Sequence, residues 1–302
     1  MSPLGDVVSV GVVLALVGAT GLAVQSLAIR YGTVETDSSS ALVLILLVNL
    51  TILVPVTFVV ENPIEALTLR SLAAFAGAGL VGTMAGRAFH FESIKRIGST
   101  RTEPIKSSQP LHASLIALVV LGETFTADHL LSMVAIVIGI AVISYEHSHS
   151  EGTADDSNYT SLLLPLTAAL FYGIEPTFAS LGFAGGTPVL TGLVVKTSSA
   201  GLGFLTYLAW QQGLPRPADV APSELHWLVG AGLANTVFLL GYYAALETEP
   251  VATIVPLVQS SPLLVIAISI AFVSDDLERV TWRLTAGALI AMMGAIGVTL
   301  SG

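Results

Sequence analysis

The residues best suited to chemistry are charged and amide side chains that lie inside long apolar segments. In the segment at 100–121, Glu103, Lys106 and Gln109 follow one another at intervals of three, so they share one face of a helix. A charged side chain inside a bilayer is costly unless it is paired or faces water. We therefore expect this face to border a water-filled cavity, where a basic group could bind an anion and a carboxylate could carry a proton.

Two prolines in the same segment indicate that its helix is interrupted. Pro104 and Pro110 each lack a backbone N–H donor and free a carbonyl one turn earlier. At membrane depth, irregular backbone is tolerated only where it is buried in protein or lines a water-filled cavity. The segment should thus line the cavity. Its counterpart in the second half keeps two prolines but has Gln259 and serines in place of the charges, which predicts a cavity with one charged and one hydroxyl-lined side.

Polar residues in other apolar segments are candidates for the same cavity. Glu175, immediately before Pro176, and Lys196 are the only charged residues well inside their segments in the second half, so we expect them to form an ion pair. Arg87 and Lys106 would bind a substrate carboxylate or phosphate. The full set of candidate substrate-binding residues is Gln25, Arg87, Glu103, Lys106, Gln109, His112, Tyr172, Glu175, Lys196 and Gln259.

Two carboxylates are candidates for proton coupling, because a carboxylate in a membrane cavity can exchange a proton for substrate. Glu175 is the first candidate and Glu103 the second. The alternative is that the pairs Glu175–Lys196 and Glu103–Lys106 only neutralise themselves and hold helix register. The alternative for Arg87 is that its side chain extends to the lipid headgroups.

Composition excludes a water-soluble protein. Hydrophobic residues make up 53% of the chain, charged residues 11%, and the mean hydropathy is +0.83, whereas soluble domains carry about 25% charged residues. The net charge of −10 argues against nucleic acid as a partner. The absence of cysteine excludes thiolate metal sites. We expect no cofactor and no metal, and interpret His147 and His149 as solvated residues of an acidic stretch.

Ten apolar segments are long enough to cross a hydrocarbon core of about 30 Å as helices. They lie at 7–29, 41–60, 71–94, 100–121, 129–145, 161–182, 187–210, 224–246, 251–273 and 281–301. The first segment has no basic residue before it and no small-x-small cleavage pattern, so we interpret it as a span rather than a signal peptide.

The chain repeats itself after 152 residues, the separation of Pro104 and Pro256. Without a gap, Pro104, Ser108, Pro110 and Leu111 align with Pro256, Ser260, Pro262 and Leu263, and Gly21 aligns with Gly173. With five spans in each half, the second copy must be inverted in the membrane. We therefore expect an all-α integral membrane protein of ten transmembrane helices, built as two inverted five-helix repeats at 1–145 and 161–302 with an acidic linker at 146–160. Such inverted repeats are typical of secondary transporters, with the substrate site near the midplane where the halves meet.

The last apolar segment of each half carries small residues seven positions apart. Ser132 with Gly139, and Gly287 with Gly294, lie on one helix face and allow close helix contact. These segments are interpreted as a scaffold, or as the surface of a homodimer, rather than as part of the substrate site.

The two stretches at 89–144 and 241–301, with Gly122-Glu123 at the end of the fourth segment, resemble the EamA-type branch of the drug/metabolite transporter superfamily. Ser274-Asp275 departs from that pattern in the second half. The resemblance covers nearly the whole chain. It implies a carrier that moves small metabolites, often amino acids, outward across the plasma membrane. It also implies that the fifth and tenth helices are peripheral and the others surround a central cavity.

The orientation has two opposed indications. The resemblance implies termini in the cytoplasm, whereas the positive-inside tendency places them outside. Most basic residues near segment ends fall on the same side of the membrane, and Arg70 falls on the other side. The basic residues on the first side are Arg30, Lys95, Arg96, Arg101, Arg216, Arg279 and Arg283.

We expect a transporter that exports a small polar metabolite, such as an amino acid, by alternating access in the plasma membrane. Charges of both signs suit a zwitterion. Two other classes stay open: a membrane scaffold or receptor without transport, and an intramembrane enzyme. Lys106 with Ser107 and Ser108 is a weak candidate for a catalytic dyad, because neighbouring residues on a helix point apart.

Overall fold

The computed structural model describes residues 9–97, 102, 105–149, 163–211, 213–216, 219–272 and 282–301, and this part of the chain is helical without strands. The first half contains α1 (Val10–Gly32), α2 (Ser38–Val60), α3 (Pro63–Ala66), α4 (Leu69–Ala78), the π-helical η1 (Gly79–Gly86), α5 (Arg87–Ile97), α7 (Gln109–Val120) and α8 (Ala127–His149). The second half contains α9 (Leu163–Phe183), α10 (Val189–Gln211), α11 (Leu225–Thr248), α12 (Val251–Val258), α13 (Ser261–Phe272) and α14 (Trp282–Ser301).

Five helices among the described residues are long and apolar enough to cross a membrane. They are Val10–Gly32, Ser38–Val60, Leu69–His90, Val189–Gln211 and Leu225–Thr248. The segment expected at 251–273 is divided into α12 and α13, and neither piece reaches the roughly 20 residues of an unbroken span. The count of ten spans therefore stays a prediction.

The interruptions occur at matching points of the two halves. Ser107 and Ser108 form a turn before α7, and Gln259 and Ser260 form a turn between α12 and α13. A proline is the second residue of the helix that follows each turn, where no helical N–H bond is lost. The structure thus has the irregular backbone that the prolines predict, although Glu103 and Pro104 lie outside the described residues.

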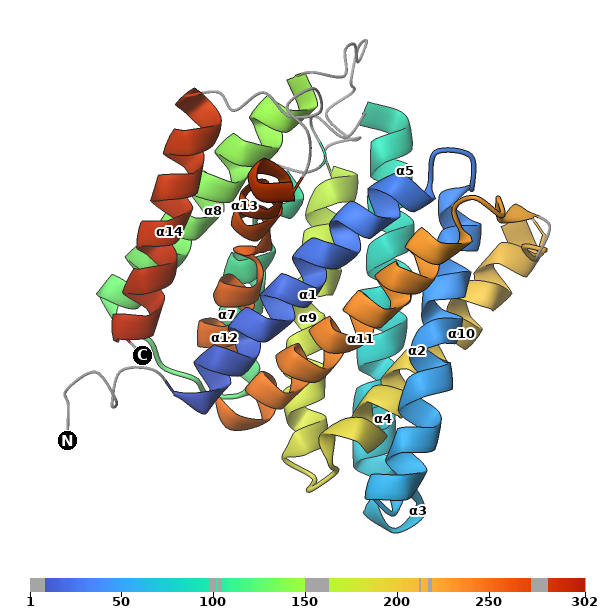
Figure 1. The fold of residues 1–302 in the computed structure, drawn as a ribbon. Helices are drawn as coiled ribbons and strands as arrows, with labels where there is room; N and C mark the ends of the chain where they lie inside the picture. The colour runs from blue at the N-terminus through green and yellow to red at the C-terminus, as the bar shows by residue number, and fades with distance from the viewer. Residues whose placement is uncertain are drawn as a thin grey trace.

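The halves are interleaved rather than separate. In Figure 1, α1 packs along α11, α8 along α14, and α9 against α7 and α4, so the main helix contacts join one half to the other. The repeat relates equivalent contacts to each other. The contact of α1 with α11 has its counterpart in the contact of α9 with α4 and η1. In the same view α1 ascends from its N-terminal end, whereas α9, its counterpart, descends.

The small-residue faces of α8 and α14 meet each other. A Cβ on Gly139 would lie 2.5 Å from the Ala291 nitrogen and 2.6 Å from the Gly287 carbonyl, and one on Gly294 would lie 2.6 Å from the Ser132 carbonyl. The predicted close helix contact is therefore confirmed, but it lies within one chain. A homodimer, which stays a prediction, would have to use another surface.

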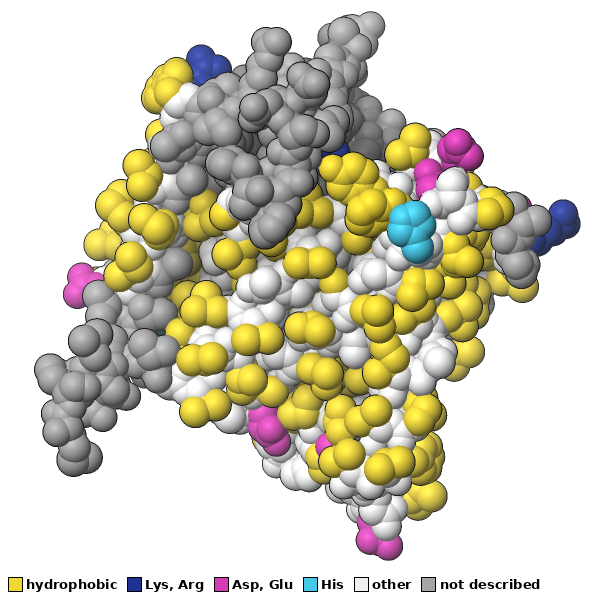
Figure 2. Space-filling view, viewed as in Figure 1, with side chains coloured by type: hydrophobic (Ala, Val, Ile, Leu, Met, Phe, Trp, Pro, Cys, Tyr) yellow, Lys and Arg dark blue, Asp and Glu magenta, His cyan; other side chains and the backbone are white. Residues whose placement is uncertain are grey.

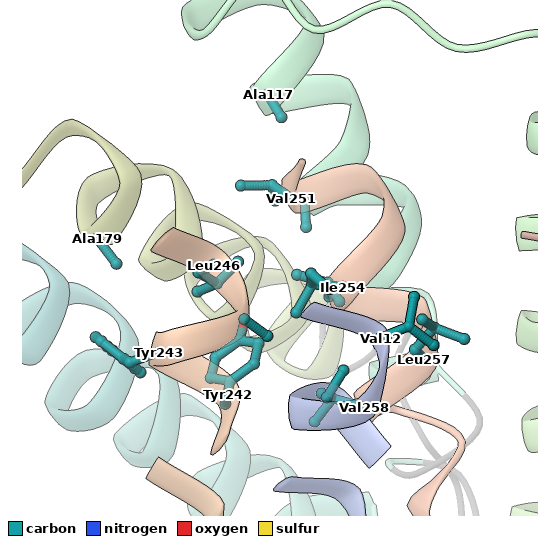
Figure 3. Packing of buried hydrophobic residues seen from close by; sticks show 14 of the residues in the cluster. Val12, Ala117, Ala179, Tyr242, Tyr243, Leu246, Val251, Ile254, Leu257 and Val258 are labelled. Carbon is teal, nitrogen blue, oxygen red and sulfur yellow. The ribbon is translucent and has the colours of Figure 1, made fainter. Parts of the chain in front are cut away.

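Apolar residues form both the core of the protein and much of its outer surface. All eight residues of α12 are buried, and Figure 3 shows Val251, Ile254 and Leu257 packed among side chains of neighbouring helices. Val59 and Val119 are 85% and 82% exposed. Figure 2 shows hydrophobic side chains over the visible face, with charged ones toward its margins. An exterior of this kind is suited to lipid.

Two carboxylates from the first half cap helices of the second. Glu61 accepts the Thr191 N–H (2.9 Å) and hydroxyl (2.7 Å) in the first turn of α10. Glu123 accepts the N–H groups of Val251 (2.8 Å) and Ala252 (3.0 Å) at the start of α12. A carboxylate is favourable there because the first N–H groups of a helix have no helical acceptor. Glu123, part of the resemblance to the EamA pattern, thus has a structural explanation.

A third carboxylate connects the halves in the opposite direction. Glu224, at the N-terminal end of α11, accepts the backbone N–H groups of Val34, Glu35 and Thr36 in the α1–α2 loop, at 2.8–3.0 Å. A hydrogen bond from the Thr36 side chain lowers the pKa of Glu224, burial opposes this, and the three backbone N–H groups lower the pKa further. The net pKa lies below the ordinary value of 4.5.

Glu224→Gln should lower the melting temperature of the purified protein at pH 7. The lowered pKa means that the stability from the charged carboxylate is present above pH 4.5 and is lost as pH falls through the lower folded-state pKa. The difference in melting temperature between wild type and Glu224→Gln should therefore shrink below pH 4.5. Glu65→Gln, at an exposed residue, is the control. If the difference in melting temperature between wild type and Glu224→Gln stays constant down to pH 3, the charge of Glu224 is not the source of its stabilising effect.

Candidate functional site

A pocket of about 310 Å³ lies where the two halves meet. The first half contributes Thr83, Arg87, His90, Lys106 and Gln109 to its lining, and the second contributes Tyr172, Glu175, Lys196, Tyr242 and Gln259. Four apolar side chains, Leu22, Phe238, Val255 and Val258, complete the wall. A small pocket with an apolar wall and a few convergent polar groups has the character of a small-molecule site.

Seven of the ten candidate residues line this pocket. They are Arg87, Lys106, Gln109, Tyr172, Glu175, Lys196 and Gln259. Gln25 and His112 are not among its lining, and Glu103 lies outside the described residues. The structure thus brings most of the set together from five separate apolar segments, while the binding role of each residue stays a prediction.

Gln25 instead belongs to a buried hydrogen-bond network. Its Oε1 atom accepts from Asn235 Nδ2 (2.9 Å), and Asn235 Oδ1 accepts from Asn49 Nδ2 (2.6 Å). The Thr236 hydroxyl lies 3.1 Å from the side-chain amide of Asn49. These four side chains join α1, α2 and α11, and each is at least 94% buried. The network satisfies polar groups that lipid could not, so Gln25 has a structural partner without a substrate.

His112 lies at a helix contact. Its Nδ1 atom is 3.0 Å from the Ser108 carbonyl, and its Cβ faces Gly173 of α9. His112 thus makes a helix contact, and its role in substrate binding stays a prediction. The Ser108 hydroxyl donates to the Ile105 carbonyl (2.7 Å), so this member of the weak dyad candidate is engaged with backbone.

Two of the lining residues form an ion pair. Lys196 Nζ lies 3.1 Å from Glu175 Oε1, which confirms the pairing expected from sequence. The Tyr243 hydroxyl donates to the same oxygen (3.0 Å), and the Lys196 ammonium lies 5.4 Å from the centre of the Tyr243 ring. Sequence reasoning missed Tyr243. The available signal was a hydroxyl-bearing ring inside an apolar segment, because a buried Tyr O–H requires a partner.

Glycines of η1 make room for this pair. Gly79, Gly82 and Gly86 recur at intervals of three and four on one side of the helix. A Cβ on Gly82 would collide with the Glu175 carboxylate, and one on Gly86 would lie 3.0 Å from the Tyr172 ring. The face without side chains therefore lets α9 approach closely enough to present Glu175. π-Helical turns within α-helices often occur at functional sites.

The two helix interruptions are connected across the pocket. Gln259 Nε2 donates to Gln109 Oε1, which joins the turn in the second half to the start of α7. Gln109 Nε2 also donates to the Tyr172 carbonyl at 3.5 Å. The interrupted segments thus present amide groups to the pocket from both halves.

Gly82→Ala should displace Glu175 and destabilise the protein. The added methyl group would meet the Glu175 carboxylate and its Cβ atom, so backbone must shift. Overpacking of this kind costs about 1–3 kcal/mol in the free energy of unfolding. Gly201→Ala in α10 is the matched control, because its Cβ would meet no atom within 4 Å. Chemical unfolding in detergent measures both, and equal stability of the two variants would contradict the proposed steric role.

Glu175 and Lys196 should be strongly coupled in a double-mutant cycle. Glu175→Gln leaves an ammonium in a mostly buried position without its 3.1 Å partner, and Lys196→Met does the same to the carboxylate. The double variant should be more stable than the sum of the single losses predicts, by about 1–3 kcal/mol. Thermal unfolding of the four proteins gives the coupling energy. Additive losses would mean that the pair is not a stabilising unit.

Comparisons with known proteins agree with this architecture. One solved crystal structure has a TM-score of 0.77 over 96% of each chain at 14% identity, which establishes a shared fold. No curated protein matches the chain. The sequence model of the EamA-like transporter family matches twice, at residues 9–145 and 160–300. These two matches span nearly the whole chain, and the protein therefore belongs to the EamA-like transporter family.

Proposed function

We propose that the protein is a secondary transporter that exports a small polar metabolite, such as an amino acid, across the plasma membrane by alternating access. Family membership supports membrane transport and argues against the intramembrane enzyme. The observation that carries the proposal is the pocket between the halves, lined by polar side chains from both. A scaffold or receptor would not require charged residues from both halves at their interface, such as Arg87 and Lys196.

The proposed architecture is ten spans in two inverted repeats, with the repeats at 1–145 and 161–302 and a linker at 146–160. The opposite directions of α1 and α9 support inversion. The exchange of equivalent helix contacts between halves supports it as well. In an inverted pair, each half can open the site toward one side of the membrane, because the two conformations are related by exchanging the roles of the repeats.

The interrupted helices are the proposed moving parts around the substrate. At their turns, the Ser108 and Ser260 N–H groups donate to carbonyls three residues earlier, at Ile105 and Leu257, instead of the four of a regular α-helix. Gln109, Tyr172 and Gln259 would orient the substrate by hydrogen bonds, while Arg87 and Lys106 would attract its anionic group.

Glu175 is the proposed proton-coupling residue, with Glu103 as the second candidate. Glu175 lines the pocket and shares its Oε1 atom with Lys196 and Tyr243. A proton taken up by Glu175 would remove one charge of this cluster and release Lys196 from its ion pair. The charge state of Glu175 would thereby change the electrostatics of the substrate site.

The proposed function is tested by counterflow in reconstituted vesicles. Vesicles loaded with a mixture of unlabelled amino acids should accumulate a labelled amino acid faster than protein-free vesicles. An imposed pH gradient should increase wild-type flux. Glu175→Gln should lose this pH-driven component, because it cannot exchange a proton, whereas Glu247→Gln, at an exposed residue of α11, should keep it.

Two results would contradict parts of this proposal separately. Full pH-driven flux through Glu175→Gln would remove Glu175 from proton coupling but leave transport intact. An absence of counterflow with any small polar metabolite would favour the scaffold or receptor class.

A further inference from the structure

The described lining of the pocket contains more basic side chains than carboxylates. Arg87, Lys106 and Lys196 line it, together with a single carboxylate, Glu175. Lys196 and Glu175 neutralise each other at 3.1 Å. Besides this pair, the described lining has two basic side chains, Arg87 and Lys106, and both belong to the first half of the chain.

One carboxylate oxygen of Glu175 already has two polar partners. Its Oε1 atom contacts the Lys196 ammonium at 3.1 Å and accepts the Tyr243 hydroxyl at 3.0 Å. Its Oε2 atom lies against Gly82, where even a methyl group would not fit. A substrate ammonium would therefore compete with Lys196 and Tyr243 for Oε1. Glu175 is thus a weaker amine-binding group than an unpaired carboxylate would be.

Arg87, unlike Glu175, lacks a polar partner among the described residues. It shares one face with Thr83 and His90, which lie four residues before it and three after, and all three line the pocket. Among the described residues, the Arg87 side chain makes no hydrogen bond and no ion pair. A guanidinium group at a membrane cavity is costly without a counter-charge. Its planar fork of N–H donors matches a carboxylate or phosphate group in a bidentate manner.

The geometry points to a soluble organic anion as the substrate, bound through a carboxylate or phosphate group to Arg87, with no ammonium group required for recognition. This rests on the proposed transport function and narrows its substrate from small polar metabolites in general to anionic ones. The Glu175–Lys196 ion pair then forms a part of the lining without net charge. The pocket volume of about 310 Å³ limits the anion to a small molecule.

Binding to the purified protein tests this inference without a membrane gradient. Titration calorimetry in detergent is performed with succinate and glycerol phosphate as anions, leucine as a zwitterion and choline as a cation. At least one anion should bind, and leucine and choline should bind at least tenfold more weakly. Arg87→Gln should weaken anion binding about tenfold to a hundredfold, the range expected for lost hydrogen bonds to a charged group.

Two further variants separate recognition from folding. Arg87→Lys keeps the positive charge but loses the bidentate fork, so it should fold like wild type and bind the anion more weakly. Arg283→Gln, at an exposed residue of α14, should bind like wild type. Equal anion affinity of wild type, Arg87→Gln and Arg87→Lys would overturn the inference. So would binding of leucine or choline in preference to both anions, or no binding of either anion.

Failure of this inference is distinguishable from failure of the proposed function. If anions bind through Arg87 but are not exchanged in vesicles, transport fails and the binding assignment stands. If leucine or choline alone is bound and exchanged, transport stands and the anion assignment fails.

Discussion

Lipid cannot form hydrogen bonds, and this constraint organises the whole molecule. Every polar group within the bilayer must find a partner in protein or in enclosed water. In this chain many of those partners lie in the other repeat. Gln25 bonds to Asn235, and Gln259 bonds to Gln109. Because each half satisfies polar groups of the other, neither could bury them alone, and the pocket forms where the two halves meet.

Close approach of the helices is what allows those bonds to form. Gly21 and Gly173 occupy equivalent positions in the two repeats, and a Cβ at either would lie 2.7–2.9 Å from a backbone nitrogen of a facing helix. Gly82 plays the same part for Glu175. Association of membrane helices depends on such packing because lipid tails are as apolar as the helices themselves. The glycines therefore belong to the functional architecture although they carry no chemistry.

Sequence reasoning succeeded where a single residue imposes a local cost. Proline removes a backbone donor wherever it stands, so the interruption before α7 was predictable, and a lone Glu175 in an apolar segment requires a cation such as Lys196. It did not indicate that Gln25, a candidate for substrate binding, lies in a buried network. A helix that is apolar on all sides has no periodicity to show which face meets lipid, protein or water. Its rotation was therefore not predictable.

The sequence by itself determined that this is a helical membrane protein with a duplicated, helix-interrupting pattern, because apolar length, proline and repeat spacing act locally. The tertiary structure decided which polar residues share the pocket, that Tyr243 completes the Glu175–Lys196 pair, and that Arg87 faces the same space. It also decided that the small-residue faces of α8 and α14 close on each other. Those outcomes depend on how helices distant in the chain rotate and approach, and one sequence carries no local signal for either.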